Sequence, residues 1–377
     1  MKPAIVIDNG TGYSKNGFGG ENQPRSVFST LIGYPKQKID SNLDKPVREY
    51  YVGTEALKLS GILKLQYPID YRTEVDWSAL EDIWQYTFQE ELRVDPSEHP
   101  VLLMEPPLNP RHYKDKMAEI MFETFNVPAL YIFNQAIFSL YASGRTTGLL
   151  VEIGESSTYI VPIFEGFSLL HAVKRLDLGG RDITKFLCQL LNQRGYIYTY
   201  SDIVEREWVR EIKEKCCYVA LDPGRELKLA ENSSGKRELL LPYGETIKIG
   251  SEACLAPEVF FNPTILERED QSLHECINSS IQECDIDLRL DLYQNIVFSG
   301  GSTLFPGLKE RLHKELTELV SPRPEPTVVR IISLPEPQNS AWYGGSLFSS
   351  MEPFQQRLVT KETYRNFGYR TYFSFRI

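Results

Sequence analysis

The chain has 377 residues, about two to three times the length of a common single domain, so two domains are expected. Hydrophobic residues make up 42% and charged residues 24%, as in ordinary globular proteins and unlike disordered or fibrous ones. The formal net charge of -10 leaves no cationic surplus to neutralise a nucleic-acid backbone. We therefore expect a two-domain globular protein that does not bind nucleic acid directly.

The sequence also lacks the features of a membrane or secreted protein. No apolar run approaches the roughly 18 residues that cross a bilayer, and residues 1–8 lack the apolar region and cleavage site of a signal peptide. The six cysteines are scattered, without the spacing of a zinc site or the density of a disulfide scaffold. We expect reduced thiols and a location in the cytoplasm, on the cytoskeleton, or in the nucleus.

Three segments share one pattern, a short apolar run that enters a turn rich in glycine, serine and threonine. They are residues 4–12, 149–158 and 295–303. Short apolar runs bounded by such turns are typical of buried strands. In the first two, a second strand pattern follows the turn, at residues 13–18 and 158–164. The sequence therefore predicts two similar hairpins, one in each domain.

Helical patterns lie between these segments. Apolar residues recur at steps of three and four in residues 77–88, 117–121, 202–219, 272–293 and 307–320, with Asp202 and Ser272 as capping residues. Strands that alternate with helices indicate an α/β fold in both domains. Residues 322–326, rich in proline, are predicted to form a stiff connector.

The turn at residues 8–12 has the residue types of a phosphate cradle. The Walker-type and dinucleotide glycine motifs are both missing, so a different cradle is needed. The glycines of Asp8-Asn9-Gly10-Thr11-Gly12 let backbone N–H groups converge on an anion, and Asp8 can hold Mg²⁺ through water. Lys15 could reach phosphates from the outgoing strand. Taken alone, a plain hairpin turn explains the motif equally well.

Motifs along nearly the whole chain resemble actin and the actin-related proteins. The matching segments are residues 91–94, 98–100, 107–110, 120–129, 140–148, 210–215 and 299–301. The resemblance implies two ribonuclease-H-like α/β lobes with ATP or ADP and Mg²⁺ (or Ca²⁺) in a cleft between them. The first lobe would comprise residues 1–136 and 338–377, with a small inserted subdomain at about 31–67, and the second would comprise residues 137–337, with one at about 180–258.

The family's site residues are carried over by motif. Phosphates would meet Gly10, Thr11, Gly12, Lys15, Gly154 and Ser157, and Glu155 and Ser156 would also bind the nucleotide. Nucleoside contacts would come from Gly180, Arg210, Lys213, Glu214, Gly300, Gly301, Ser302, Phe305 and Gln338. Asp8 and Glu152 would bind the metal through water. Gln135 would orient the attacking water, and Glu152 and Tyr159 would be further catalytic residues.

Several positions depart from the family. Its second turn reads Asp-Ser-Gly-Asp-Gly, whereas this chain has Glu152-Ile153-Gly154-Glu155-Ser156. Tyr159 replaces the histidine near the attacking water, and Gln338 replaces a lysine near the adenine. A displacement of about 1 Å in a catalytic group can cost about 100-fold in rate. We expect ATP binding with slow hydrolysis; the alternative is that backbone shifts accommodate both glutamates.

The assembly surfaces differ as well. Residues 36–50 and 266–272 are charged where a conventional actin is neutral and partly apolar, which predicts weak head-to-tail self-assembly. An apolar groove for actin-binding proteins is better preserved, at Tyr141, Ala142, Gly144, Thr146, Gly166, Phe167, Phe348 and Met351. The aromatic C-terminal stretch, residues 367–377, is either a partner-specific edge or packed against its lobe.

Three functions follow from the resemblance. The first is an ATP-binding cytoskeletal protein whose nucleotide state controls lobe closure and assembly. The second is a non-polymerising, actin-related subunit of a larger complex, such as a motor adaptor, a nucleator or a chromatin remodeller. A kinase of the same fold is less well supported, because no stretch remains to supply its carboxylate base. The charged assembly segments favour the second function or a divergent actin.

Overall fold

The computed structural model describes residues 2–36, 48–70, 74–231, 237–240, 244, 246–321 and 327–374. They form two compact units, Met1–Thr146 with Asn339–Ile377, and Thr147–Gln338. Most of the charged segment 36–50 and the whole connector 322–326 lie outside the described residues. The domain boundaries inferred from the sequence, after residues 136 and 337, stay a prediction.

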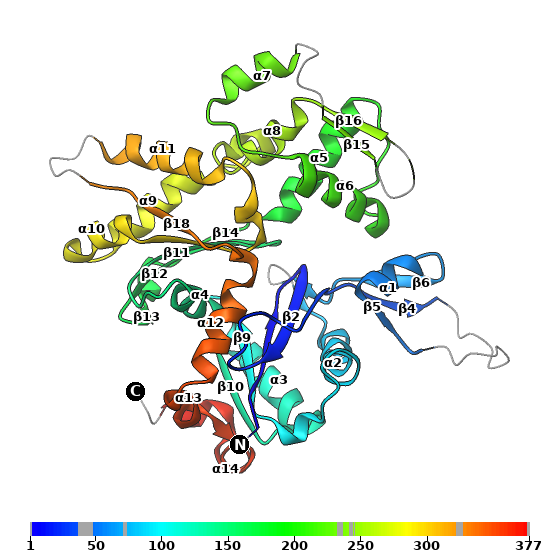
Figure 1. Ribbon diagram of the computed structural model, residues 1–377, viewed down its shortest axis with the longest axis vertical. Helices are drawn as coiled ribbons and strands as arrows, with labels where there is room; N and C mark the ends of the chain where they lie inside the picture. The colour runs from blue at the N-terminus through cyan, green and yellow to red at the C-terminus, as the bar shows by residue number, and fades with distance from the viewer. Residues whose placement is uncertain are drawn as a thin grey trace. The chain divides into compact units, whose positions relative to one another are not determined.

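The first unit is built on a sheet with the strand order β19-β10-β9-β1-β2-β3 (Figure 1). Its strands are β1 (Ile5–Asn9), β2 (Tyr13–Phe18), β3 (Ser26–Ser29), β9 (Val101–Glu105), β10 (Ala129–Asn134) and β19 (Val359–Thr360). β1 and β2 are antiparallel, whereas β1, β9 and β10 run parallel to one another. The predicted hairpin around residues 8–12 is therefore confirmed.

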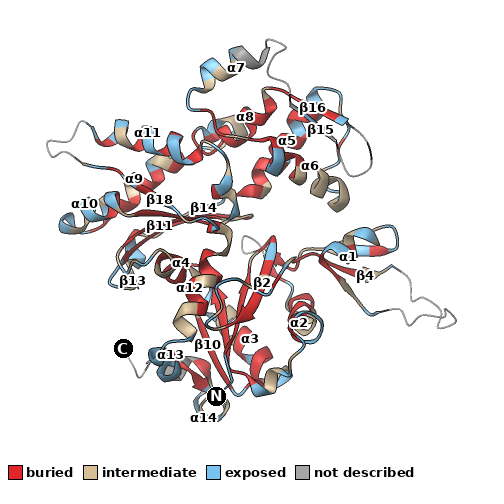
Figure 2. Cartoon of the chain, in the orientation of Figure 1, coloured by how far each residue is buried: buried red, intermediate tan, exposed pale blue. Residues whose placement is uncertain are grey.

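Both faces of this sheet are buried, because side chains alternate along each strand and helices cover each side (Figure 2). Ile5 and Ile7 pack in one cluster with α2 and α3, and Val6 packs in another with α4 and α12. The helical segments are α2 (Trp77–Tyr86), η1 (Thr87–Leu92), η2 (Pro96–Glu98), α3 (Arg111–Glu119), η3 (Ile120–Thr124), α4 (Gln135–Ala142), α12 (Ser340–Ser349), α13 (Glu352–Arg357) and α14 (Lys361–Ser374).

The C-terminal helix α14 is anchored in this core. Gly368, at φ 70°, interrupts the helix, and the next residue, Tyr369, is buried. The Tyr369 hydroxyl accepts a hydrogen bond of 2.7 Å from the backbone N–H of Ile132 in β10. Two interpretations were left open for the C-terminal stretch. At Tyr369, this stretch is packed against its lobe.

A second, smaller sheet lies in the region of the predicted inserted subdomain. Its order is β5-β4-β6, from β4 (Ile32–Pro35), β5 (Tyr51–Val52) and β6 (Leu63–Gln66), with α1 (Gly53–Lys58) beside it. Ile32 and Val52 pack against Ala79 and Ile83 of α2. A short pair, β7 (Ile69–Asp70) and β8 (Glu74–Val75), leads into that helix.

The second unit repeats the strand arrangement of the first. Its sheet has the order β13-β12-β11-β17-β18, and β14 also pairs with β12. The strands are β11 (Gly148–Ile153), β12 (Thr158–Phe164), β13 (Phe167–Ser168), β14 (Lys174–Leu176), β17 (Ile296–Ser299) and β18 (Ile331–Ser333). β11 is antiparallel to β12 and parallel to β17, as β1 is to β2 and β9. The second predicted hairpin and the third predicted strand are thus confirmed.

Most helices of the second unit share one large core with this sheet. The helical segments of this part of the chain are η4 (Leu170–Ala172), α5 (Gly180–Gln193), α6 (Ile203–Cys216), α7 (Pro223–Glu231), α8 (Glu252–Glu258), η6 (Pro263–Leu266), α9 (Leu273–Glu283), α10 (Ile286–Gln294), η7 (Gly301–Leu304), α11 (Leu308–Val320) and η8 (Pro337–Asn339), beside the hairpin β15 (Arg237–Leu240) and β16 (Thr246–Ile249). All six cysteines are buried free thiols.

One helix prediction is wrong. Residues 272–293 form two helices, α9 and α10, because Cys284 and Asp285 adopt extended backbone angles. The Arg289 guanidinium closes the end of α9 by donating to the carbonyl oxygens of Cys284 at 2.9 Å and Gln282 at 2.7 Å. The predicted caps are confirmed: Asp202 accepts from the N–H of Val204, and Ser272 forms a capping box with Glu275.

The described part of the chain contains no helix that is both long and apolar enough to cross a membrane.

Candidate functional site

The first turn, residues 9–13, is held rigidly by its own backbone and by one threonine. The N–H of Gly10 donates to the Tyr13 carbonyl at 2.9 Å, which closes the hairpin between β1 and β2. Thr30 fixes the turn from outside, with its hydroxyl 2.6 Å from the Thr11 carbonyl and its N–H 3.1 Å from the Gly12 carbonyl. These contacts occupy carbonyl groups of the turn.

Two charged side chains face each other beside this turn. Asp8 and Lys15 are opposite in the β1–β2 register, and Lys15 Nζ donates to Asp8 Oδ2 at 3.0 Å. Their side chains are only 5% and 15% exposed. Next to them, Trp84 Nε1 donates to Asn9 Oδ1 at 2.7 Å. The predicted metal residue and the predicted phosphate lysine are therefore paired with each other.

The second turn has the geometry of the first. The N–H of Gly154 donates to the Ser157 carbonyl at 3.0 Å, the same three-residue step as from Gly10 to Tyr13. Glu152 lies opposite Tyr159 in the β11–β12 register, as Asp8 lies opposite Lys15 in the first unit. The two turns are thus equivalent in structure, but the pair beside the second turn has no amine.

The predicted catalytic residues are divided between the units. Glu152 and Tyr159 are buried side chains of the second unit, and the Arg175 guanidinium lies over the Tyr159 ring at 5.9 Å. Gln135 belongs to the first unit, where it begins α4 just after Asn134, whose side chain caps the helix through the N–H of Ala136 at 2.9 Å. Their joint catalytic role stays a prediction.

Beyond the second turn, several predicted nucleotide residues converge on Gly180, the first residue of α5. A Cβ atom at Gly180 would lie 2.7 Å from Glu155 Oε2, 2.8 Å from Ser302 Oγ and 3.1 Å from Lys213 Nζ. Lys213 Nζ also donates to the Gly180 carbonyl at 2.8 Å, and Ser302 Oγ donates to the Gly154 carbonyl at 3.0 Å. We call these four residues, Glu155, Gly180, Lys213 and Ser302, the Gly180 cradle.

The Gly180 cradle is strongly polar. Burial alone would raise the pKa of Glu155. The positive charges around it together have the larger effect and hold the pKa below its ordinary value; they belong to Lys213, which contributes most, and to Arg210, Arg181 and Arg206. The Glu155 carboxylate is therefore ionised and lies in a cationic environment.

Other predicted nucleoside residues lie in different surroundings. Arg210 is nearly buried and pairs with Glu207 at 3.3 Å and with Glu214 at 2.9 Å. Glu214 is therefore turned toward Arg210, with 52% of its side chain exposed. Phe305 packs edge-on to Phe260, with ring centroids 6.3 Å apart. These three side chains are engaged with their own unit.

The remaining predicted nucleoside residues are Gly300, Gly301 and Gln338. Gly300 has φ 88° and ψ 153°, and its N–H donates to the Pro337 carbonyl at 2.9 Å. A Cβ at Gly301 would lie 3.9 Å from the Gln338 Cβ, so these residues are neighbours.

The second unit fits a polar ligand on two observations. Buried polar atoms without a hydrogen-bond partner among the described residues include Ser157 Oγ, in the turn, and Gln338 Oε1, beside Gly301. Lys213 Nζ and Ser302 Oγ lie 3.1 and 2.8 Å from the Cβ position of Gly180, and both groups suit an anion or a hydroxyl. For a metal, Asp8 offers a buried carboxylate, and among the described residues no three His, Cys, Asp or Glu side chains cluster.

The predicted partner-groove residues fall in both units. In the first unit, Tyr141 and Ala142 end α4 and are half-buried, Gly144 and Thr146 are exposed, and Phe348 of α12 packs on Phe138 at 5.5 Å while Met351 is exposed. In the second unit, Gly166 is half-buried and Phe167 is 72% exposed at the β12–β13 turn. Their service as one groove stays a prediction.

Three residues that shape the site were missed from the sequence. Thr30 and Trp84 contact the first turn from distant segments, so no local pattern marks them. Gly179 was overlooked beside Gly180, although a Cβ there would lie 2.7 Å from the Glu155 carbonyl. The adjacent glycines at the start of a helix were the available signal.

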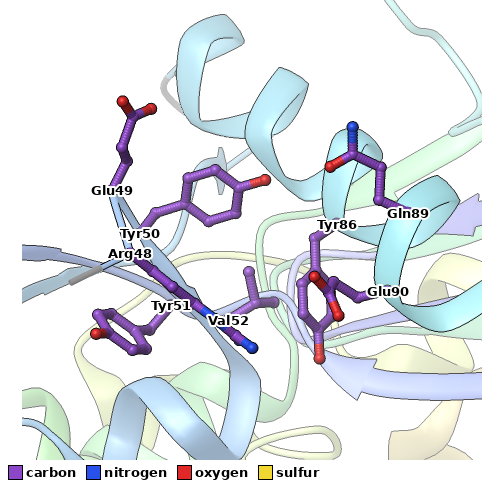
Figure 3. Close-up of a pocket in the computed structure, with 8 residues that line it drawn as sticks. All are labelled: Arg48, Glu49, Tyr50, Tyr51, Val52, Tyr86, Gln89 and Glu90. Carbon is purple, nitrogen blue, oxygen red and sulfur yellow. The ribbon is translucent and has the colours of Figure 1, made fainter. Parts of the chain in front are cut away.

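A hollow of about 220 Å³ lies elsewhere, in the first unit (Figure 3). It is lined by Arg48, Glu49, Tyr50, Tyr51, Val52, Tyr86, Gln89 and Glu90, from the segment around β5 and from the end of α2 and η1. Burial raises the pKa of Tyr50 to about 12. The hollow is smaller than the roughly 300 to 1,000 Å³ of a typical ligand pocket. It contains no residue of either turn.

The comparison with known families agrees with these geometries. The sequence model of the family described as Actin matches residues 1–373 of the 377. The central strands of the two units have equivalent orders, β10-β9-β1-β2 and β18-β17-β11-β12, with equivalent hairpin turns, which is the two-lobed α/β fold that the sequence predicts. The chain therefore belongs to the actin family.

Proposed function

We propose that this actin-family chain binds ATP or ADP together with a divalent cation. The observation that carries the proposal is the Gly180 cradle, where a residue without a Cβ lets Lys213 Nζ and Ser302 Oγ approach its backbone closely. The turn before it adds Ser157 Oγ, which is buried without a partner among the described residues. Glycine-rich turns that present N–H groups are common phosphate sites.

The remaining site residues take roles by analogy with the family. Asp8 and Glu152 would hold Mg²⁺ or Ca²⁺ through water, and the bound cation would neutralise charge on the phosphates. Lys15 lies 3.0 Å from Asp8 Oδ2 and is close enough to the first turn to exchange that carboxylate for a phosphate. Lys213, which lies beside the second turn, is likewise placed to exchange the Glu155 carboxylate for a phosphate.

We further propose that hydrolysis is slow. Glu152 and Glu155 each carry one methylene more than the family's aspartates, which changes the reach of both acids. Tyr159 stands where the family has a histidine, and a neutral phenol, unlike an imidazole, does not take up a proton at neutral pH. Binding is less sensitive to these changes than catalysis, because several donors share the phosphate charge.

The charged segment 266–272 supports weak self-assembly. Arg268 pairs with Asp182 at 3.1 Å and donates to the Asp177 carbonyl at 2.7 Å, so its guanidinium is engaged by its own unit. At the end of the segment, Ser272 is fixed to Glu275 by the capping box. This observation favours the second candidate function, a non-polymerising subunit of a larger complex on the cytoskeleton or in the nucleus.

The test of nucleotide binding is titration of the full-length protein with ATP and Mg²⁺. Lys213→Met should weaken ATP binding by at least about tenfold, since it removes a charged donor. Lys215→Met is the matched control, because Lys215 lies on the same helix but pairs with Glu211 at the surface. Absence of saturable binding by the unaltered protein at millimolar ATP would overturn the proposal.

Assembly and hydrolysis are tested together. The purified protein is incubated with ATP, ADP or no nucleotide, pelleted, viewed by electron microscopy and assayed for phosphate release. Monomers with bound ATP and slow release are expected. Long filaments in Mg-ATP would contradict weak self-assembly, and rapid phosphate release would contradict slow hydrolysis.

A further inference from the structure

The side chain of Glu155 occupies the Gly180 cradle. Its Oε2 atom lies 3.8 Å from Lys213 Nζ and would lie 2.7 Å from a Cβ on Gly180. Ser302 Oγ borders the same space. A carboxylate of the protein is therefore placed among the groups that make this space suitable for a polar ligand.

The backbone of Glu155 is fixed, so the position of the carboxylate depends on the length of the side chain. The N–H of Arg181 donates to the Glu155 carbonyl at 2.8 Å, and Gly179 packs so closely that a Cβ there would lie 2.7 Å from that carbonyl oxygen. A glutamate extends one C–C bond, about 1.5 Å, farther than an aspartate. An aspartate carboxylate on this backbone would therefore reach about 1.5 Å less far toward Gly180.

Charge holds the carboxylate in place. Lys213 is buried, with 4% of its side chain exposed, and among the described residues Glu155 is the acid that lies within ion-pair distance of its Nζ. The arginines at 181, 206 and 210 add to the positive field around Glu155. A buried lysine without a counter-ion would be costly, so the pair stabilises the fold around Lys213.

We propose that Glu155 is an internal occupant of the nucleotide site, a counter-ion of Lys213 that a nucleotide must displace from the space over Gly180. This inference rests on the proposed nucleotide binding and adds the residue that limits its affinity. The displaced carboxylate loses its contact with Lys213 and stays close to an anionic ligand. Shortening or neutralising the side chain should therefore tighten binding.

The experiment measures the dissociation constant for Mg-ATP with the full-length protein. Glu155→Asp should bind about three- to tenfold more tightly than the unaltered protein, and Glu155→Gln should also bind more tightly, because it keeps the length but not the charge. Glu211→Asp and Glu211→Gln are matched controls on α6, where Glu211 pairs with Lys215 at the surface. Both controls should stay within about twofold.

A second measurement needs no bound nucleotide. Glu155→Gln should lower the melting temperature of the ATP-free protein more than Glu211→Gln does, since Lys213 loses its counter-ion. Saturating ATP should raise the melting temperature of Glu155→Asp more than that of the unaltered protein.

The outcomes separate this inference from the proposed function. Unchanged or weaker ATP binding by both Glu155 variants, with the unaltered protein still binding, would overturn the inference alone and make Glu155 a ligand contact or a bystander. If no variant binds ATP, the proposed function fails, and the inference fails with it.

Discussion

Gly180→Ala and Gly300→Ala each add one methyl group to the second unit, but they should affect its stability very differently. A Cβ at Gly180 would meet the ends of three flexible side chains, those of Glu155, Ser302 and Lys213, at 2.7 to 3.1 Å. A Cβ at Gly300 would instead overlap the backbone carbonyl of Ile153 in the middle of the sheet. The side-chain ends can rotate away, whereas the strand cannot move without breaking its pairing.

The magnitudes follow from this difference. Gly300 has φ 88° and ψ 153°, a region open almost only to glycine, so Gly300→Ala carries about 1 to 3 kcal/mol of backbone strain before its overlap with Ile153 is counted. We expect a loss of at least about 3 kcal/mol, a large part of the roughly 5 to 15 kcal/mol that stabilises a domain. Gly180→Ala should change stability by less than about 1 kcal/mol, because Gly180 has an ordinary helical start.

The assays are urea unfolding followed by circular dichroism, and titration with Mg-ATP. Gly180→Ala should fold normally and bind ATP at least about tenfold more weakly, since its methyl group fills the cradle. Gly61→Ala is the control, because a Cβ there meets nothing within 4 Å. Equal destabilisation by Gly180→Ala and Gly300→Ala, or unchanged ATP binding by Gly180→Ala, would refute the reasoning.

Three further changes test the interior. Trp84→Phe removes the donor to the buried Asn9 Oδ1 and should cost about 1 to 3 kcal/mol; a melting temperature equal to the original would contradict this. Arg311→Met leaves the Glu258 carboxylate buried without its partner at 3.1 Å and should lower the urea midpoint by an amount equivalent to about 3 to 5 kcal/mol. The pKa of Glu155 is lowered from 4.5, so this carboxylate stabilises the fold above that pH and loses its effect as the pH falls through its folded pKa. Glu155→Gln should lack this part of the acid sensitivity. A stability difference between the unaltered protein and Glu155→Gln that is constant from neutral pH to about pH 3 would contradict this.

The hairpins could be predicted from the sequence because all of their determinants are local. An apolar run, a glycine-rich turn and a second strand pattern lie close together, within residues 4–18 and 149–164, and the β1–β2 and β11–β12 registers follow from them. The break between α9 and α10 could not be predicted in this way. No glycine or proline marks it, and the stabilising side chain, Arg289, donates back to carbonyls five and seven residues earlier.

The arrangement of the candidate site depends on tertiary structure. The sequence, through its resemblance to the family, indicated all four residues of the Gly180 cradle, but not that the Glu155 carboxylate lies over Gly180. These residues come from a turn, two helices and the η7 segment, so only the fold brings them together. The pairing of Arg210 with Glu214 was not predicted for a different reason. The two are one helical turn apart, and the family roles carried over assign both to the nucleotide.

The two turns also differ in how their acids are neutralised, and this difference predicts an effect of removing the metal. In the first unit Asp8 is paired with Lys15 at 3.0 Å, within one hairpin, so a cation bound through water at Asp8 would release Lys15 toward a phosphate. We therefore expect ATP affinity to fall by at least about tenfold when divalent cations are chelated, because Asp8 then recaptures the lysine. Asp8→Asn cannot hold Lys15 as an ion pair, so its ATP affinity should depend less on the cation. Titrations with Mg²⁺ and with EDTA, on both proteins, decide the matter: equal cation dependence of the two would show that Lys15 is not released in this way.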